Sequence, residues 1–308
     1  MSLVSRWERF WFEPVPPHVY ALLRIVFGVL GCAALIGLSD LPTFWDVDGF
    51  VALEPGRALK QFLETRGLGA LAGRSLYVVS MLIFAAMAVG YRSAVVVPLA
   101  FVLALAQSSW SYFPLSGAHS VMLGVLFGLI WADCGAVWSV DAWMERRRAP
   151  SITAARTPIA ALRLIRFQVA IIYLNTGLWK LFGEEWRDGS AVFYVLNQNL
   201  FGRFSADRLP ASLDWVATVA TYTTLVWEIA FAALVLSSRT RWIALGLGIV
   251  IHLGLLVSID VGLFSIVMLA TYVAYLSPDR VALWFDGRTV SRGEPSNTRL
   301  SGSTDPVH

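Results

Sequence analysis

The sequence predicts an all-α membrane protein, a polytopic helical bundle with about eight transmembrane helices. Of its 308 residues, 57% are hydrophobic and only 15% are charged, and the mean hydropathy is +0.64. Soluble domains have about 25% charged and roughly 45–50% apolar residues. The apolar residues also come in long blocks, and one membrane-spanning helix needs about 20 of them. These observations exclude an ordinary soluble domain.

Eight apolar blocks along the chain fit transmembrane helices. The second and third blocks are separated only by Gly90-Tyr91-Arg92, which predicts a tight helical hairpin. The fourth and eighth blocks are short, and we expect these two to be tilted or partly re-entrant. The predicted spans are 19–38, 74–91, 93–109, 118–133, 162–182, 212–236, 240–258 and 261–276.

The two ends of the chain differ from the blocks between them. Residues 1–17 lack the apolar core and cleavage site of a cleaved signal peptide. Their aromatic and basic residues instead predict an interfacial segment that lies at the membrane surface. Its expected anchors are Trp7, Phe10, Trp11 and Phe12. Residues 277–308 are expected to form a polar inner tail, disordered from about 291.

Arginine placement predicts the orientation, because cytoplasmic loops carry an excess of basic residues. An N-in, C-in arrangement puts most arginines inside, and the short outer loops 110–117 and 259–260 then carry none. The inner arginines are at positions 6, 9, 92, 146–148, 156, 239, 241, 280 and 288. Two outer loops, 40–66 and 183–211, are long and aromatic, so we expect them to fold as caps. In the first, a short amphipathic helix is expected from Pro55.

Common site motifs are missing from the sequence. It has no CxxC, HExxH, GxSxG, phosphate-binding glycine loop or metal-ligand cluster, so no metal is expected. Cys32 and Cys134 are predicted to lie at different depths and therefore to form no disulfide. The net charge of +3 reflects loop arginines and predicts no nucleic-acid binding.

The fifth span carries a polar stripe. Tyr173, Thr176 and Lys180 follow a 3–4 spacing and therefore share one helix face. Gln168 and Asn175, seven residues apart, share a neighbouring face. Polar residues within spans are costly and usually face the interior of the bundle, so the stripe indicates a functional site.

Two histidines on other spans are predicted to reach the depth of Lys180: His119 at the outer end of the fourth and His252 in the outer half of the seventh. Simpler interpretations remain open. Lys180 could extend to the headgroups, His119 could lie beside them, and His252 could form an inter-helix hydrogen bond. Glu228, towards the inner half of the sixth span, could pair with a neighbouring polar group or with Arg239.

The choice of lysine at position 180 favours proton chemistry. Among the 24 basic residues, only Lys60 and Lys180 are lysines. Arginine keeps its proton at any ordinary pH, whereas a lysine in a dry site loses it readily and can then accept one. Arginine would serve equally well in a purely electrostatic role.

Four ordered sequence elements resemble the HTTM domain, the membrane portion of vitamin K-dependent gamma-carboxylase and of many bacterial proteins. The longest is ALRLIRFQVAIIYLNTGLWKLFGEEWRDGSAVFYVL, which contains Gln168, Tyr173, Gly177, Lys180-Leu181, Trp186 and Gly189. The other three are RIVFG at 24–28, GAHSVML at 117–123 and HLGLLVSIDVGLFSIVML at 252–269. The similarity covers roughly residues 18–276.

The resemblance implies that Lys180 is a base and that His119 is the histidine of the family's His-Ser element. In the carboxylase, the matching lysine deprotonates vitamin K hydroquinone, which reacts with oxygen to become a strong base. That base removes the γ-proton of a glutamate so that CO2 can add. The enzyme has a Lys-Lys pair where this chain has Trp179-Lys180, and a large lumenal domain where this chain has residues 277–308.

We therefore predict a carboxylase-like protein of the bacterial inner membrane that binds and deprotonates a quinol at an outer-leaflet site for oxidation or carboxylation. Lys180 is the predicted base, with His119 and His252 as proton or hydrogen-bond partners. A polar site under aromatic loops suits a flat lipophilic ring with ionisable hydroxyls. The predicted ring contacts are Tyr173, Asn175, Thr176 and Trp186. The expected cofactor is menaquinol or vitamin K hydroquinone, and the expected partners are membrane lipid and a small protein or peptide.

Two other classes remain open. The first is a non-catalytic membrane protein that binds a lipid, quinone or peptide and aids maturation or export of a partner. The resemblance implies this class because some bacterial relatives take part in peptide-toxin maturation. A transporter has weaker support, because Pro98 is the only mid-membrane break and no repeat pair is present.

Overall fold

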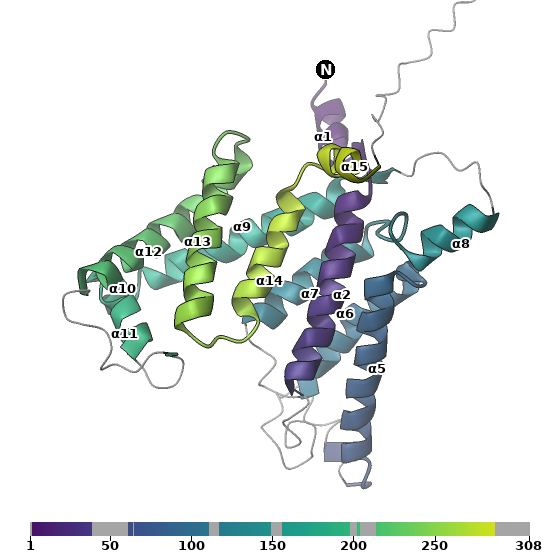
Figure 1. The fold of residues 1–308 in the computed structure, drawn as a ribbon, viewed down its shortest axis with the longest axis horizontal. Helices are drawn as coiled ribbons and strands as arrows, with labels where there is room; N and C mark the ends of the chain where they lie inside the picture. The colour runs from purple at the N-terminus through teal and green to yellow at the C-terminus, as the bar shows by residue number, and fades with distance from the viewer. Residues whose placement is uncertain are drawn as a thin grey trace, which may run out of the picture.

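The computed structural model describes residues 2–38, 61–63, 65–110, 117–148, 156–197, 202–203 and 214–286. Helices make up nearly all of the regular structure in these ranges (Figure 1). The strands are two residues long, β1 (Pro14–Val15) and β2 (Thr157–Pro158), and they pair antiparallel. The prediction of an all-α protein is confirmed.

Every predicted apolar block forms a helix. The long helices are α2 (His18–Leu38), α5 (Gly69–Val89), α6 (Ser93–Trp110), α7 (Gly117–Ile130), α9 (Ala160–Lys180), α12 (Asp214–Leu236), α13 (Arg241–Ser258) and α14 (Phe264–Thr271), which η3 (Tyr272–Tyr275) continues. The short helices are α1 (Leu3–Phe12), α8 (Val140–Arg148), α10 (Glu184–Arg187), α11 (Ala191–Asn197) and α15 (Pro278–Asp286). Helices α1 and α15 lie together at one end of the bundle (Figure 1).

The predicted count of eight spans is not confirmed. Within the described ranges, α2, α5, α12 and α13 are long and apolar enough to cross a membrane, and a fifth span results if α14–η3 and α15, bent by 92°, count as one. Helices α6 and α7 are apolar but shorter. Helix α9 has 21 residues but includes three basic ones, Arg163, Arg166 and Lys180, which lower its hydropathy.

The expected loop caps and tail are described only in part. The first loop, 40–66 with its helix from Pro55, lies almost wholly outside the described residues, as do 287–308. In the second loop, 183–211, the described residues include α10 and α11. The first part of the expected tail forms α15, which buries Val281 and Ala282 and exposes Trp284 and Phe285. An amphipathic helix therefore stands at the start of that segment.

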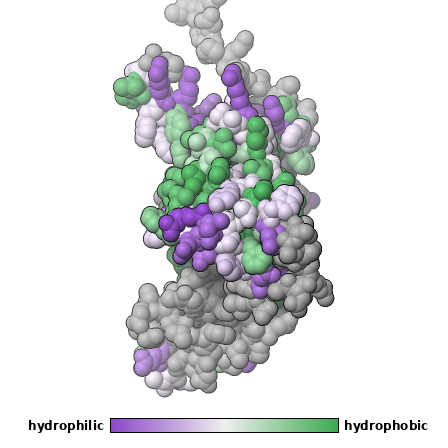
Figure 2. All heavy atoms as spheres, turned by 90° about the vertical axis from the view of Figure 1, so that its left-hand side faces the viewer, coloured by the Kyte–Doolittle hydropathy of each residue, from purple (hydrophilic) through white to green (hydrophobic). Residues whose placement is uncertain are grey.

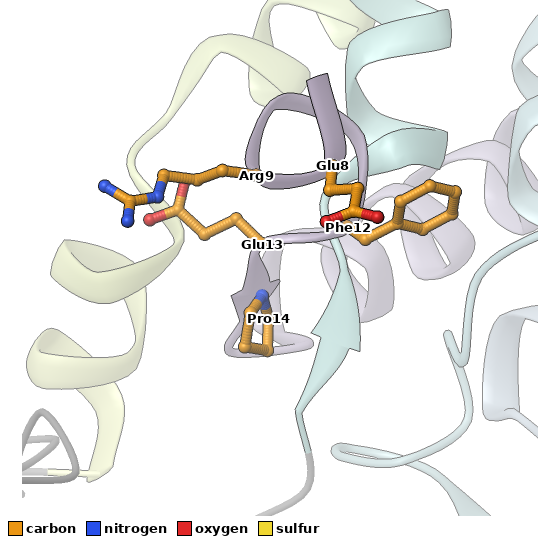
Figure 3. A pocket seen from close by; sticks show the side chains of 5 residues that line it. All are labelled: Glu8, Arg9, Phe12, Glu13 and Pro14. Atoms are coloured by element: carbon orange, nitrogen blue, oxygen red, sulfur yellow. The ribbon is translucent and has the colours of Figure 1, made fainter. Parts of the chain in front are cut away.

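The N-terminal segment folds as the amphipathic helix α1. The Ser2 hydroxyl caps it by accepting from the Ser5 backbone N–H at 3.1 Å. The Arg163 guanidinium of α9 stacks on the Phe10 ring at 3.8 Å, and Trp7 remains exposed. A shallow depression of about 540 Å³ borders the helix and is lined by Glu8, Arg9, Phe12, Glu13 and Pro14 (Figure 3). It shares no residue with the candidate site below.

Arg24 ties three parts of the bundle together. Its side chain is fully buried in α2. Nη1 donates to the carbonyls of Met87 and Ala88 at 2.6 and 2.7 Å, at the C-terminus of α5, where helix carbonyls lack partners within the helix. Nε and Nη2 donate to the carbonyls of Cys134 and Trp138 in the loop after α7, at 3.0 and 2.7 Å. One guanidinium thus fixes α2, α5 and this loop relative to one another.

The predicted α5–α6 hairpin is confirmed. Gly90 ends α5 with φ 72°, in the left-handed region that glycine adopts without strain. The Asp141 carboxylate of α8 accepts from the backbone N–H groups of Arg92 and Ser93, each at 2.7 Å. This contact satisfies two free donors at the start of α6.

Both cysteines are free, as predicted. Cys134 is buried in the loop after α7, and this burial raises the pKa of its thiol to about 11. The thiol is therefore protonated and unreactive near neutral pH.

Helix α7 packs on α9 through Gly124 and Gly128, which form a small-xxx-small motif. A Cβ added at Gly124 would overlap the amide of Gln168. A Cβ at Gly128 would lie 2.5 Å from Cγ1 of Ile165. These two glycines allow α9 to approach α7 closely.

We expect Gly128→Ala to lower the free energy of unfolding by about 1–3 kcal/mol, because the added Cβ would overlap the buried Ile165 side chain. Gly246→Ala is the matched control, because a Cβ there meets no atom within 4 Å. Thermal unfolding of the two detergent-solubilised variants, followed by size-exclusion chromatography, measures the difference. Equal melting temperatures would contradict the proposed packing role of Gly128.

Candidate functional site

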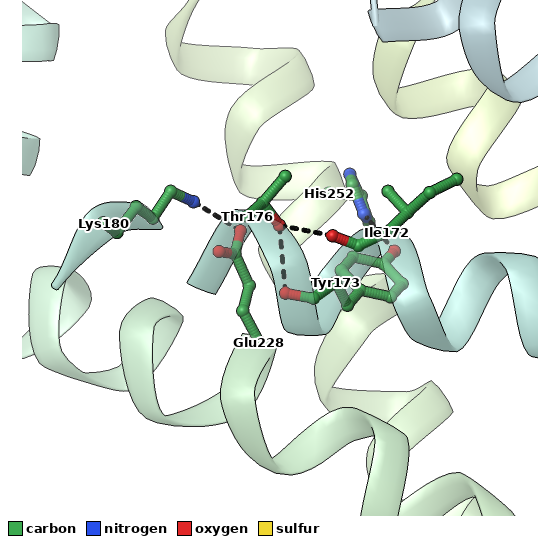
Figure 4. Close-up of polar contacts among 6 residues, drawn as sticks. All are labelled: Ile172, Tyr173, Thr176, Lys180, Glu228 and His252. Atoms are coloured by element: carbon green, nitrogen blue, oxygen red, sulfur yellow. Dashed lines mark hydrogen bonds and ion pairs between the residues drawn. The ribbon is translucent and has the colours of Figure 1, made fainter. Parts of the chain in front are cut away.

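The polar stripe of α9 faces α12, and its three residues share one face as the spacing predicts (Figure 4). Close approach of the two helices occurs at Gly177, where an added Cβ would lie 3.0 Å from the backbone nitrogen of Ile229. The glycine therefore brings the end of α9 against the interior of α12.

This approach pairs Lys180 with Glu228. The Lys180 ammonium donates to Oε1 of Glu228, and we call this contact the α9–α12 ion pair. The side chains are 24% and 11% exposed, respectively. The Trp186 ring of α10 covers the lysine, with Nζ 4.5 Å from the ring centroid. Lys180 also stands at the C-terminus of α9, where the helix dipole favours a cation.

Of the two partners suggested for Glu228, a neighbouring polar group and Arg239, the structure shows the first, Lys180. The sequence placed Glu228 towards the inner half of its span and Lys180 at the outer end of another. In the structure, Glu228 lies about 21 Å from the start of α12 and about 12 Å from its end, at 1.5 Å per residue. Since the end of α9 meets this interior part of α12, the two residues lie at one level.

A second polar group, the tyrosine–histidine cluster, consists of Tyr173, His252 and Tyr272. The Tyr173 hydroxyl lies 2.7 Å from Nε2 of His252 on α13 and 2.9 Å from the Tyr272 hydroxyl on η3. All three side chains are buried, and the rings of Trp227 and Phe231 pack against Tyr173 at 4.6 and 4.3 Å. His252 therefore forms an inter-helix hydrogen bond. Its Nδ1 is buried and has no hydrogen-bond partner among the described residues.

Thr176 lies between the ion pair and the cluster (Figure 4). Its hydroxyl is 2.9 Å from the carbonyl of Ile172 and 3.0 Å from that of Tyr173, as a donor within α9. Figure 4 shows the α9–α12 ion pair on one side of Thr176, and Tyr173 with His252 on the other. The structure therefore brings Lys180, Thr176, Tyr173 and His252 into one region.

His119 lies at a different helix interface. Its Nε2 is 3.0 Å from the Ala104 carbonyl and 2.7 Å from the Ser108 hydroxyl, both on α6. A carbonyl only accepts hydrogen bonds, so Nε2 carries a proton. Across the described ranges, no contact joins His119 to Lys180 or His252.

Of the other polar and aromatic residues singled out in the sequence, one lies at the ion pair and two lie away from it. Trp186 lies over Lys180, whereas Asn175 is exposed on α9. Gln168, on the neighbouring face, packs against Gly124 of α7. No described group of three or more His, Cys, Asp or Glu side chains could hold a metal ion.

The segment from α10 to α11 is fastened to α12 and so positions Trp186. The Tyr222 hydroxyl donates to the Arg187 carbonyl at 3.0 Å, and the Val192 N–H donates to the Thr221 hydroxyl at 3.0 Å. Between them, the Ser190 N–H and hydroxyl donate to the Asp188 carboxylate, and these bonds hold its pKa below the ordinary value.

The HTTM domain family matches residues 12–280. The chain belongs to the HTTM domain family. Two proteins of Bacillus subtilis (strain 168) are similar to parts of it. Sporulation-delaying protein SdpB is 30% identical over 139 residues, 44% of this chain and 43% of SdpB. The uncharacterized protein YitO is 28% identical over 145 residues, 46% of each chain. The chain thus matches less than half the length of each relative, and no solved structure matches.

The structure assigns a place to each HTTM element. RIVFG supplies Arg24, and GAHSVML begins α7 with His119. The longest element forms α9 and ends that helix at Lys180, and the last element supplies His252. Glu228 and Tyr272 lie outside the residues that sequence reasoning assigned to the site. A charged residue within an apolar block was the available signal for Glu228, but its partner could not be identified from sequence.

Proposed function

We propose that this HTTM-domain membrane protein binds a lipophilic quinol and removes a proton from it at the α9–α12 ion pair. The observation that carries the proposal is a lysine–glutamate pair between two helices, beside a buried tyrosine–histidine cluster. A ring with ionisable hydroxyls fits such surroundings, because Trp186 offers an aromatic face and Lys180 a charge. When bound, a reduced quinone would supply the electrons that reduce dioxygen in oxidation or carboxylation chemistry.

Lys180 and Glu228 act as one unit in this proposal. A lysine can accept a proton only while its amine is neutral. In this proposal Lys180 first gives its proton to Glu228, which holds it. When Lys180 takes the hydroxyl proton, an O–H bond breaks and an N–H bond forms on Nζ. The Lys180 ammonium that results then pairs with the quinol anion. Tyr173 and His252 orient this region, and His119 stabilises the contact between α6 and α7.

We also propose an N-in, C-in orientation in the bacterial inner membrane. The support is the arginine distribution, with Arg6 and Arg9 on α1 and Arg146–Arg148 on α8. Basic residues next to spans favour the cytoplasmic side. The two Bacillus subtilis relatives support a bacterial setting.

We expect Lys180→Arg to abolish quinol turnover while preserving the fold. Arginine can still pair with Glu228, but it does not release its proton at ordinary pH. The measurement is oxidation of menaquinol by dissolved oxygen in the presence of the purified protein in nanodiscs, followed by absorbance, with melting temperature as the folding control. Lys60→Arg is the matched control, since it replaces the other lysine. Quinol turnover by Lys180→Arg at the wild-type rate would contradict the proposal.

A second candidate function is non-catalytic assistance in the maturation or export of a peptide or protein. Its support is the family resemblance, which includes bacterial relatives that take part in peptide-toxin maturation. In that case the α9–α12 ion pair joins helices and has no chemical role. Purification with a stable protein partner and without menaquinone, determined by mass spectrometry of the extract, would favour this candidate.

A further inference from the structure

Two arginine–aromatic stacks belong to segments that meet at Asp141. At the α5–α6 turn, the guanidinium carbon of Arg92 is 5.6 Å from the centroid of the Tyr91 ring. On α8, the guanidinium carbon of Arg147 is 3.9 Å from the centroid of the Trp143 ring. The Asp141 carboxylate of α8 accepts from the Arg92 backbone N–H at 2.7 Å and so holds α8 against the turn. Both stacks therefore lie at the same end of α5 and α6.

The C-terminal tip of α8 is a run of exposed arginines, Arg146–Arg148. Within α8 only Ala142 is buried, and the helix extends away from the bundle (Figure 1). Three arginines against Asp141 and Glu145 leave the helix with a net positive charge, and Asp141 is already bound to backbone N–H groups. We call Arg92 and Arg146–Arg148 together the arginine patch.

Within the described ranges, the four side chains of the arginine patch form no hydrogen bond and no ion pair. A guanidinium that stacks on a ring uses its flat face, and its N–H groups point outwards in the plane of the group. Buried Arg24, by contrast, uses its donors on four backbone carbonyls. The patch therefore presents donors that match the oxygens of a phosphate, which a guanidinium binds with two parallel hydrogen bonds.

The apolar surface of the spans ends directly beside the α5–α6 turn. Val89 before the turn is 55% exposed and Val95 after it is 62% exposed. Helix α5 is long and apolar enough to cross a membrane, and most of its residues are not buried within the protein. Figure 2 shows the same arrangement on another face of the molecule, where a hydrophobic band lies between hydrophilic zones. The arginine patch therefore lies at the depth of lipid head groups, where tyrosine and tryptophan are also enriched.

Arg92 occupies a backbone position that disfavours a long side chain. Its φ is 49°, in the left-handed region that glycine, asparagine and aspartate adopt more readily. Strained positions of this kind are concentrated at functional sites. The arginine at this position therefore supports a role for its side chain at the surface.

We propose that the arginine patch binds the phosphate groups of anionic phospholipids at the membrane surface. In the N-in orientation proposed above, this surface is the cytoplasmic leaflet. Tyr91 and Trp143 lie among the head groups and hold Arg92 and Arg147 at the level of the phosphates. The charge selects anionic over zwitterionic lipid, because one basic residue beside an anionic surface strengthens binding by roughly fivefold. This role of α8 is independent of the quinol chemistry.

The test uses the purified full chain in phosphatidylcholine nanodiscs that contain phosphatidylglycerol with a diazirine at its head group. After irradiation, mass spectrometry measures the labelling of α8 and of the α5–α6 turn. We expect unlabelled phosphatidylglycerol to reduce this labelling, whereas equal amounts of phosphatidylcholine, inorganic phosphate or polyglutamate leave it unchanged. Competition by any of these three as strong as that by phosphatidylglycerol would overturn the proposal, since the patch would then bind any lipid, free phosphate or an acidic protein.

Arg147→Gln should lower the labelling of α8 by about fivefold, and Arg147→Lys, which keeps the charge, should lower it less. The matched control is Arg66→Gln. Arg66 is also exposed and stacks on the Phe62 ring at 4.4 Å, but it precedes α5, at the end opposite the α5–α6 turn. This control should label α8 as the wild type does, and melting temperatures verify folding. Equal labelling of α8 in Arg147→Gln and the wild type, or wild-type labelling of α8 no stronger than that around Arg66, would overturn the assignment.

Discussion

Lys180→Met is expected to destabilise the protein by about 2–4 kcal/mol and Glu228→Leu by a similar amount, whereas the double variant should be about as stable as the wild type. Removing one member of a buried ion pair leaves the other charge uncompensated. Replacing both by apolar residues of similar size is often neutral or stabilising. The expected loss of stability lies towards the lower end of the range for buried ion pairs, because the Lys180 side chain is 24% exposed.

The measurement is a double-mutant cycle, with unfolding in mixed detergent micelles followed by Trp fluorescence. The matched control is the pair of Arg203 and Asp260, whose atoms are 3.5 Å apart and whose side chains are 46% and 68% exposed. Arg203→Met should change stability by no more than about 1 kcal/mol. Additive effects of the Lys180 and Glu228 substitutions would show that the α9–α12 ion pair is not energetically coupled.

The same double variant separates structure from chemistry. If Lys180 and Glu228 only join α9 to α12, a stable double variant keeps whatever activity the wild type has. If they move a proton, the double variant folds but does not turn over quinol. A folded, fully active double variant would therefore assign the pair a purely structural role.

Local sequence patterns predicted the elements of this protein well. Apolar blocks identified the eight long helical segments that the described ranges contain, because burial in lipid or protein requires continuous hydrophobic length. The 3–4 spacing predicted that Tyr173, Thr176 and Lys180 share a face, since that spacing is a property of the helix itself.

Relations between helices were harder to predict. Depth along the membrane was deduced from distance to a helix end, and this placed Glu228 and Lys180 in opposite halves. The prediction fails where the end of one helix meets the interior of another, as α9 meets α12 at Gly177. His119 has the depth of an end residue, but the sequence does not show that its ring faces α6. Facing directions depend on the packing of other helices, which sequence spacing does not encode.

Arg24→Met is expected to have the largest effect on folding of any single substitution considered. The guanidinium is fully buried and donates to four backbone carbonyls on two other segments. A hydrogen bond from a charged group is worth about 1.5–3 kcal/mol, and a buried polar group left without a partner costs about 1–3 kcal/mol. These contributions are not additive. Leaving all four carbonyls without the guanidinium donor should still lower the free energy of unfolding by at least about 4 kcal/mol. We therefore expect little folded protein in the membrane.

Arg24→Lys tests whether charge or geometry is decisive. A lysine keeps the positive charge but has three donors on one nitrogen, whereas the carbonyls of Met87, Cys134 and Trp138 surround a planar guanidinium. We expect this variant to accumulate far below the wild type, as measured by fluorescence-detected size-exclusion chromatography. Arg239→Met, at an exposed position, is the control and should match the wild type. Wild-type accumulation of Arg24→Lys would mean that a buried cation suffices and that the geometry of the hydrogen bonds does not matter.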